Sequence, residues 1–249
     1  MNNLYKTSIS IVKQMLPLYF AGLFFILERL TYNFSNIFKD SKTRLKFSEN
    51  VVSTVNSCIV IIYAFNVIQD PEAWDNRLLY KSNYAILVND ILIGYSLYDM
   101  IICILRYETS GIWFFIHAFN ILISTFCIRK FNIFYFYSSV YALYEISTPF
   151  LHIRWTLIKM KVTNKSLKNT IDVILIISYF CCRIVWGQLI GNYLCTYDLY
   201  NNFILNTESD IIVPSKPLSW FIILNVQILN ILSIYWFSLM FRKLLKLIF

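Results

Sequence analysis

The chain has few of the residues that build flexible linkers and metal sites. Its 249 residues include only 5 Gly and 5 Pro, so no Gly- or Pro-rich linker separates domains, and the glycines form no phosphate-binding pattern. Its two histidines, His117 and His152, and its six cysteines lack zinc-type spacing. We therefore expect one folded unit that holds no metal and no other cofactor.

Charge is also scarce. Charged residues make up 14% of the chain and hydrophobic residues 58%, with a mean hydropathy of +0.58. A helix of roughly 20 residues crosses a hydrocarbon core of about 30 Å, and apolar runs of that length recur along the whole chain. The sequence predicts an all-α fold, a polytopic transmembrane helical bundle.

Seven membrane spans are predicted from these runs. The first is read as a retained span, not as a cleaved signal peptide, because no small-residue cleavage site follows it. Only a few residues separate the fourth and fifth, which form either a very tight hairpin or a re-entrant segment. The predicted spans are 9–27, 51–68, 84–105, 110–128, 131–150, 170–194 and 218–241.

The basic residues predict the orientation of the chain. Fourteen of the 22 Lys and Arg fall in 28–49, 106–109, 151–169 and the C-terminal tail, which the seven spans place on one face of the membrane. Such an excess marks the cytosolic face, so we expect a cytosolic C-terminus and an N-terminus in a lumen. The net charge of +8 has the same explanation, and we expect no nucleic-acid partner.

Five short motifs carry a resemblance to a known family. In chain order they are Lys46 to Asn56, Gly94-Tyr-Ser-Leu-Tyr-Asp99, Phe115-Ile-His-Ala118, Glu145-Ile-Ser-Thr-Pro-Phe-Leu-His-Ile-Arg-Trp155 and Arg183-Ile-Val-Trp-Gly187. Their order and spacing resemble the TLC domain, named for TRAM, LAG1 and CLN8 proteins. The resemblance implies an N-terminal span with a cytosolic loop at 1–43, a six-span TLC domain at 44–249, and residence in the endoplasmic reticulum.

The family resemblance bears on catalysis through one histidine. Ceramide synthases of this family use a His-His pair for acyl transfer from acyl-CoA, and this chain has His117 followed by Ala118. The segment after Lys130 also lacks the clustered acids of those enzymes. His117 is therefore the one candidate catalytic residue, and the departures favour a protein that is not an enzyme.

Polar residues within the apolar runs are candidates for a lipid cavity, because such groups usually face protein or a cavity and not lipid. Asp99 is expected to be paired inside the bundle, with Arg154 and Arg183 as candidate partners, whereas Asp90 is read as a helix-end residue at the interface. Glu145 precedes Ser147-Thr148-Pro149, which predicts a break in the helix. The lipid-cavity candidates are Asp99, His117, Asn120, Glu145, Arg154 and Arg183.

The sequence is compatible with three functions. The first is non-catalytic binding or sensing of membrane lipids, with sphingolipids and phospholipids as candidate classes, by which the protein influences membrane lipid composition and homeostasis. The second is a ceramide-synthase-like N-acyltransferase that uses His117. The third is an accessory protein for membrane cargo or translocation. We favour the first.

Overall fold

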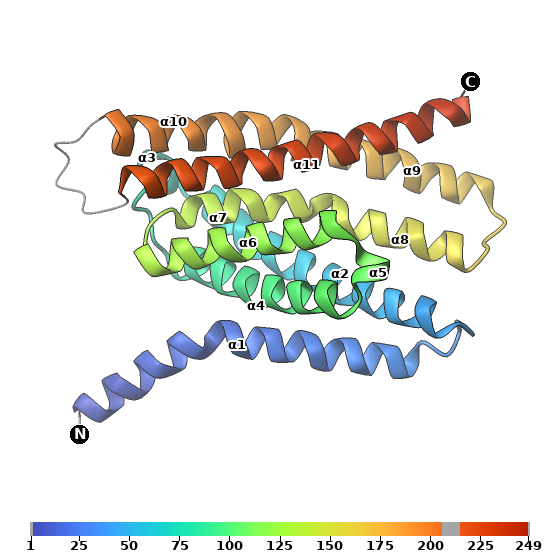
Figure 1. The fold of residues 1–249 in the computed structure, drawn as a ribbon, viewed down its shortest axis with the longest axis horizontal. Helices are drawn as coiled ribbons and strands as arrows, with labels where there is room; N and C mark the ends of the chain where they lie inside the picture. Colours follow the sequence, from blue (N-terminus) through green and yellow to red (C-terminus); the bar gives the residue numbers. More distant parts are fainter. Residues whose placement is uncertain (1, 206–214, 249) are drawn as a thin grey trace.

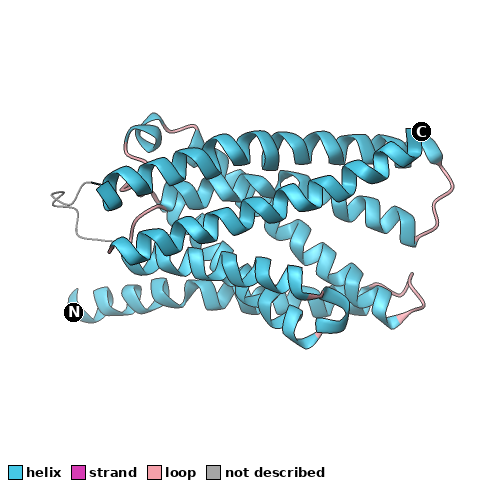
Figure 2. Cartoon of the chain, turned by 45° about the horizontal axis from the view of Figure 1, so that its top comes forward, coloured by secondary structure: helices cyan, strands magenta, loops and turns pink. Residues whose placement is uncertain are grey.

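The computed structural model describes residues 2–205 and 215–248, and these residues form helices without a strand (Figures 1 and 2). The long helices run roughly parallel and antiparallel, with the N-terminus and the C-terminus at opposite ends (Figure 1). The helices are α1 (Asn2–Phe34), α2 (Ser41–Ile68), α3 (Pro71–Asp75), α4 (Asn83–Leu105), α5 (Tyr107–Ser110), α6 (Ile112–Phe131), α7 (Tyr135–Ala142), α8 (Thr148–Lys159), α9 (Lys165–Tyr179), α10 (Cys195–Leu199) and α11 (Lys216–Ile248).

Within this part of the chain, six helices are long and apolar enough to cross a membrane. They confirm the predicted all-α, polytopic bundle. The six are Gln14–Phe34, Ser41–Ile68, Asn83–Leu105, Ile112–Phe131, Lys165–Leu205 and Lys216–Arg242.

The remaining predicted span, 131–150, is an interrupted helix. It runs through α7, a tighter 3₁₀ turn at Leu143–Ser147, and then α8. The turn lies just before Pro149, which stands in the first turn of α8 and cannot donate a backbone hydrogen bond. A seventh crossing therefore depends on this interrupted segment and stays a prediction.

The hairpin between α6 and α7 is as short as the sequence requires. Asn132 ends α6 in the left-handed conformation, with φ of 58°, and Phe134 adopts φ of 65° just before α7. Asn tolerates this region better than most residues, and the Phe134 amide is satisfied by the Leu78 carbonyl at 2.8 Å. The chain thus reverses within three residues, and α6 begins two residues later than the predicted span and ends three residues beyond it.

Helix α1 packs closely on α2 and α4. Phe24 and Phe25 make ring contacts with Tyr98, at centroid distances of 6.2 and 4.9 Å. At Gly94, α4 approaches α1 so closely that a Cβ atom on this residue would lie 2.5 Å from Phe20 Cβ and 2.7 Å from the Pro17 carbonyl oxygen. The N-terminal span is therefore part of the bundle, and the predicted boundary at 43/44 marks no gap in packing.

The segment after α9 continues as a helix much further than predicted. Wide π-type turns at Phe180–Val185, Gly187–Leu194 and Tyr200–Leu205 join α9 to α10 and extend it to Leu205. The predicted span 170–194 therefore ends eleven residues too early, and residues 206–214 lie outside the described part. Wide turns of this kind often occur at functional sites, and one of them carries Arg183.

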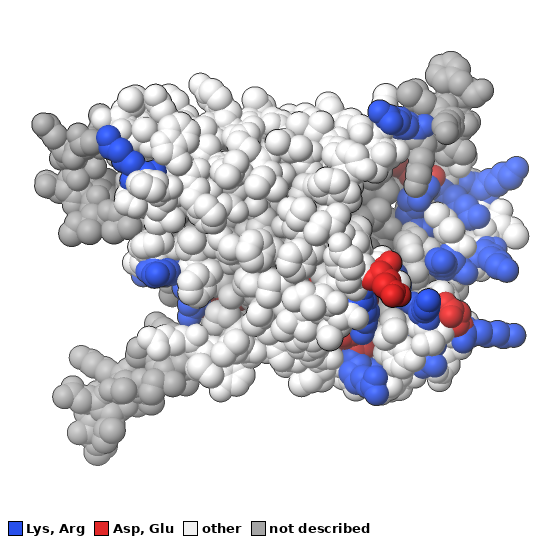
Figure 3. Space-filling view, viewed as in Figure 1, with Lys and Arg blue, Asp and Glu red and all other residues white. Residues whose placement is uncertain are grey.

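Charged side chains lie at the two ends of the bundle, with an uncharged band between them (Figure 3). On the face shown, most Lys and Arg gather at the end where the C-terminus lies. We call it the basic end; it holds the α1–α2 and α8–α9 connections. This grouping is the one on which the predicted orientation depends.

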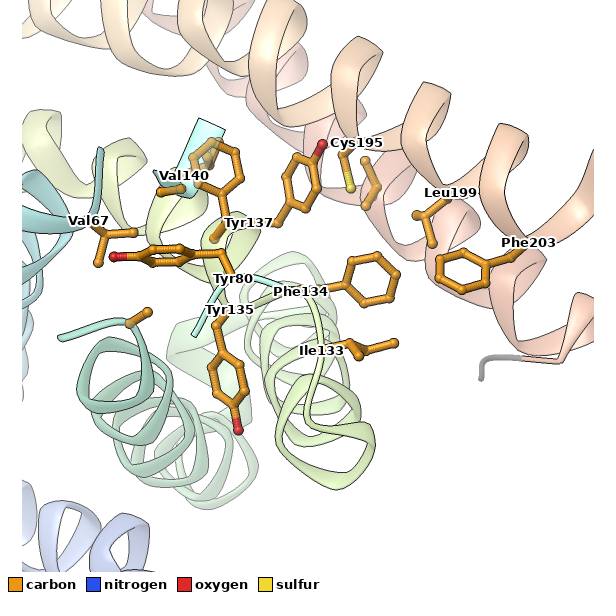
Figure 4. Packing of buried hydrophobic residues seen from close by; sticks show 14 of the residues in the cluster. Val67, Tyr80, Ile133, Phe134, Tyr135, Tyr137, Val140, Cys195, Leu199 and Phe203 are labelled. Carbon is orange, nitrogen blue, oxygen red and sulfur yellow. The ribbon is translucent and has the colours of Figure 1, made fainter. Parts of the chain in front are cut away.

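The opposite end is packed with aromatic rings (Figure 4). Phe134, Tyr137 and Phe203 belong to one buried cluster that joins the start of α7 to the end of the α9–α10 segment. Arg77, in the α3–α4 connection, donates to both carboxylate oxygens of Asp198 at 2.7 and 2.9 Å, and the Tyr137 hydroxyl donates to the same carboxylate. Burial of these rings and this ion pair closes the bundle at the end away from the basic residues.

Candidate functional site

A cavity of about 340 Å³ lies among the helices toward the basic end. Its wall is built by α2, α4, α6, α8, α11 and the segment around Tyr179 and Arg183. Four of the six predicted site residues line it: Asp99, His117, Glu145 and Arg183. The structure therefore brings together residues that lie far apart in the sequence, while their contact with lipid stays a prediction.

Several polar atoms of the cavity wall have no hydrogen-bond partner among the described residues. Both side-chain polar atoms of Asn56, the Asn50 amide nitrogen, the Tyr98 hydroxyl and His117 Nδ1 are of this kind. Asn56 is fully buried and Asn50 and Tyr98 are nearly so, at 5% and 2% exposure. Buried polar groups are normally satisfied, so four such residues around one cavity are an unusual concentration of unpartnered groups.

The buried pair Glu145 and Arg183 lies at the inner end of this cavity. The 3₁₀ turn directs the Thr148 amide to the Glu145 carbonyl, which leaves the Tyr144 carbonyl without that amide as a partner. Arg183 Nε donates to the Tyr144 carbonyl at 3.0 Å, and Nη2 donates to Glu145 Oε1 at 3.3 Å. Arg183 thus donates hydrogen bonds both to the backbone carbonyl that the turn leaves free and to the Glu145 carboxylate.

Hydroxyl groups complete the surroundings of this ion pair. The Thr148 hydroxyl donates to Glu145 Oε2 at 2.6 Å, and the Ser57 hydroxyl of α2 donates to the same oxygen at 3.1 Å. Arg183 also donates to the Ser147 and Thr148 hydroxyl oxygens, at 3.3 and 3.2 Å. The Ser147 hydroxyl also donates to the Tyr144 carbonyl at 3.4 Å, whereas the Thr148 hydroxyl donates to the Glu145 side chain.

A second, apolar pocket of about 80 Å³ adjoins the first. His117, Glu145 and Arg183 line both spaces, so they lie at the boundary between them. The apolar pocket then extends along α6 and α11 past Ile121 and Val226. The larger cavity carries charged and amide side chains on a wall that is otherwise mostly apolar, and the smaller pocket is almost entirely apolar.

The two histidines share the larger cavity. His117 lies against Trp236 of α11, with ring centroids 5.4 Å apart, and His152 Nδ1 shares a hydrogen bond of 2.9 Å with the Thr54 hydroxyl. His117 lies on α6 and His152 on α8, 35 positions further along the chain. The helical path through the 3₁₀ turn into α8 carries His152 onto the cavity wall, which periodicity within one helix could not indicate.

Charged residues bridge three helices beside the cavity at the basic end. Arg106, just after α4, donates to Glu28 of α1 at 2.6 Å and to Glu49 of α2. Lys46 pairs with Glu49 at 2.9 Å and keeps 45% of its side chain exposed. Because Lys46 and Glu49 also line the cavity, its wall extends to charged groups near the membrane surface.

The other two predicted site residues lie elsewhere. Asn120 is buried and donates to Asn225 Oδ1 at 2.8 Å, so it joins α6 to α11. Arg154 forms an ion pair with Asp172, which ties α8 to α9. Neither lines the cavity.

The structure differs from the expectations for both aspartates of α4. Arg183 pairs with Glu145 and Arg154 with Asp172, so neither is the partner of Asp99. Asp90 is 3% exposed and forms an ion pair with Arg129 of α6. It therefore joins two helices inside the bundle and does not reach the interface, because a basic residue of the neighbouring helix lies opposite it.

Comparison with known proteins gives one consistent result. Residues 46–242 match the family model described as the TLC domain. A TLC domain-containing protein of Schizosaccharomyces pombe is 30% identical over 203 residues, which cover 80% of this chain and 65% of the relative. A TLC domain-containing protein of Saccharomyces cerevisiae is 27% identical over 206 residues, which cover 78% of this chain and 61% of the relative.

A human relative is matched over more of its length. TLC domain-containing protein 4 of Homo sapiens is 26% identical over 239 residues, which cover 92% of this chain and 84% of the relative. By contrast, the chain spans less than two thirds of the two fungal relatives.

Proposed function

Because the chain belongs to the TLC domain family, we propose that its cavity binds a membrane lipid and that the protein acts as a non-catalytic lipid-binding or lipid-sensing protein. The unpartnered polar atoms around the cavity support this proposal most directly. An interior polar atom without a partner costs free energy, and a polar ligand in the cavity would supply that partner. A lipid head in the larger cavity would give the unpartnered polar atoms hydrogen-bond partners, and its hydrocarbon chain would fill the apolar pocket.

The proposal includes a location and an orientation. The protein would reside in the endoplasmic reticulum, with its N-terminus in the lumen and its C-terminus in the cytosol, and would influence membrane lipid composition and homeostasis. The basic end supports the orientation, since Lys and Arg are retained on the cytosolic face. The organelle and the effect on lipid composition rest on the resemblance to the family.

Lipid extraction and mass spectrometry of the purified protein test the proposal. We expect one lipid class to be enriched over the host membrane. Ser53 lines the cavity, so Ser53→Phe should fill it and remove the enrichment. Ser178, on α9, does not line it and provides a matched control as Ser178→Phe. A lipid profile equal to that of the host membrane in the wild type would contradict the proposal and favour the cargo or translocation accessory role.

One observation keeps N-acyl transfer as a second candidate. His117, His152 and Asp99 line the same cavity, which supplies titratable groups for acid–base chemistry despite the alanine at 118. Incubation of the purified protein with a long-chain base and acyl-CoA separates the two functions. Product formation that is lost in His117→Ala would establish catalysis, and the absence of product with bound lipid present would support the non-catalytic role.

A further inference from the structure

Among the described residues of the spans, one acidic residue, Asp99, forms no ion pair. The other acidic residues in the described spans and in the interrupted segment each form an ion pair with Lys or Arg: Glu28, Glu49, Asp90, Glu145, Asp172 and Asp198. Asp99 has neither an ion pair nor a hydrogen bond to any described residue, and it lines the cavity. An ionisable side chain within a membrane span is normally paired, so Asp99 calls for a partner from outside the chain.

The surroundings of Asp99 fit a donor of several hydrogen bonds. Asn56 Oδ1 is a buried acceptor without a partner on the same cavity wall, and the Tyr98 hydroxyl oxygen is another. The neighbouring acid Glu49 already accepts from Lys46 and Arg106. The amide nitrogens of Asn50 and Asn56 are unpartnered donors on the same wall, so the free acceptors and the carboxylate favour a ligand head that carries positive charge and N–H groups together with an oxygen acceptor.

The balance of charge along the wall points in the same direction. Glu49, Asp99 and Glu145 face the cavity with Lys46 and Arg183 as the cations, which leaves one negative charge in excess. An anionic head would meet this excess as repulsion. A quaternary ammonium has no N–H to donate to Asp99 or Asn56, whereas a primary ammonium has three.

We propose that the cavity binds a lipid whose polar head carries a primary ammonium group, and that Asp99 is the counter-ion of that group. The inference rests on the proposed lipid-binding function and names the class of lipid. The hydrocarbon part would extend past His117 and Arg183 into the apolar pocket. Both a single-chain amine and an ethanolamine phospholipid carry this head chemistry.

Binding assays with matched lipids test the assignment. The full chain in uncharged detergent micelles is titrated with octadecylamine and, separately, with octadecanol, which has the same chain without the charge. Phosphatidylethanolamine and phosphatidylcholine of identical acyl chains form the second pair and distinguish the two sources of the amine. We expect at least tenfold tighter binding of the amine within at least one pair, which corresponds to about 1.4 kcal/mol.

Two variants locate the preference. Asp99→Asn keeps the size of the side chain and should remove the preference for the amine without weakening octadecanol binding. Asp172→Asn makes the same change at an acid that does not line the cavity, and the preference should persist. Persistence of the preference in a folded Asp99→Asn protein would overturn the assignment.

The wild-type comparison keeps the inference testable even if Asp99→Asn does not fold. Equal affinity for both members of each pair, with measurable binding, refutes the ammonium assignment and leaves lipid binding intact. No binding of any of the four lipids refutes the proposed function itself. The two failures are therefore distinct results.

Discussion

Replacement of Arg183 by methionine should destabilise the bundle more than any other change at the cavity. Arg183 is 7% exposed and donates to the Tyr144 carbonyl, to Glu145 and to two hydroxyl oxygens. Methionine preserves much of the side-chain volume and removes every one of these donors. The change isolates the polar contribution of one residue.

The magnitude follows from the contacts. Hydrogen bonds between membrane helices average about 0.6 kcal/mol, so the four acceptors account for roughly 2 to 3 kcal/mol. The variant also leaves the Glu145 carboxylate buried without its cation, and removal of one partner of a buried ion pair costs about 3–5 kcal/mol in total. We expect a loss of about 3–5 kcal/mol in the free energy of unfolding.

Reversible unfolding in mixed micelles measures this loss, and a double-mutant cycle with Glu145→Gln separates its two causes. If the orphaned carboxylate contributes, Arg183→Met combined with Glu145→Gln should lose less than the sum of the single losses, by about 1–3 kcal/mol. A loss below 1 kcal/mol for Arg183→Met, or additive single losses, would refute the reasoning.

Three further predictions concern packing, the closed end and topology. Gly94→Ala should destabilise the protein by about 1–3 kcal/mol in the same unfolding assay, whereas Gly22→Ala, whose Cβ meets no atom within 4 Å, should stabilise it by up to about 1 kcal/mol because alanine favours the helix. Arg77→Met should cost about 3–5 kcal/mol because it orphans Asp198, while Lys165→Met at an exposed position should change stability by less than about 0.5 kcal/mol. Protease protection of terminal tags should place the C-terminus in the cytosol and the N-terminus in the lumen, and both tags on one side would contradict an odd number of crossings.

The sequence was most informative about features that depend on residues of a single helix. Apolar run length identified each long helix, and the step from Glu145 to Pro149 indicated the break that the structure forms as a 3₁₀ turn. These features depend on local hydrogen bonding and burial in lipid, which neighbouring residues determine.

Features that depend on which helices are neighbours could not be predicted in the same way. The partners of Asp90 and Arg154 lie on other helices, and no periodicity within one span identifies them. The same holds for His152, which reaches the cavity of His117 because α8 packs on α2. The family resemblance singled out Asp99, yet only the packed bundle shows that it lacks a cation.

The aromatic cluster around Phe134 and Tyr137, together with the Arg77–Asp198 pair, has a consequence for exchange with the bilayer. If the cavity holds the proposed lipid head, that head has packed rings and a buried ion pair on one side and the charged side chains of the basic end on the other. Entry and exit of a head would therefore take place through a single leaflet. Occupancy would follow the lipid concentration of that leaflet by mass action, so the protein would report on the asymmetry of its membrane and not on the average of both layers.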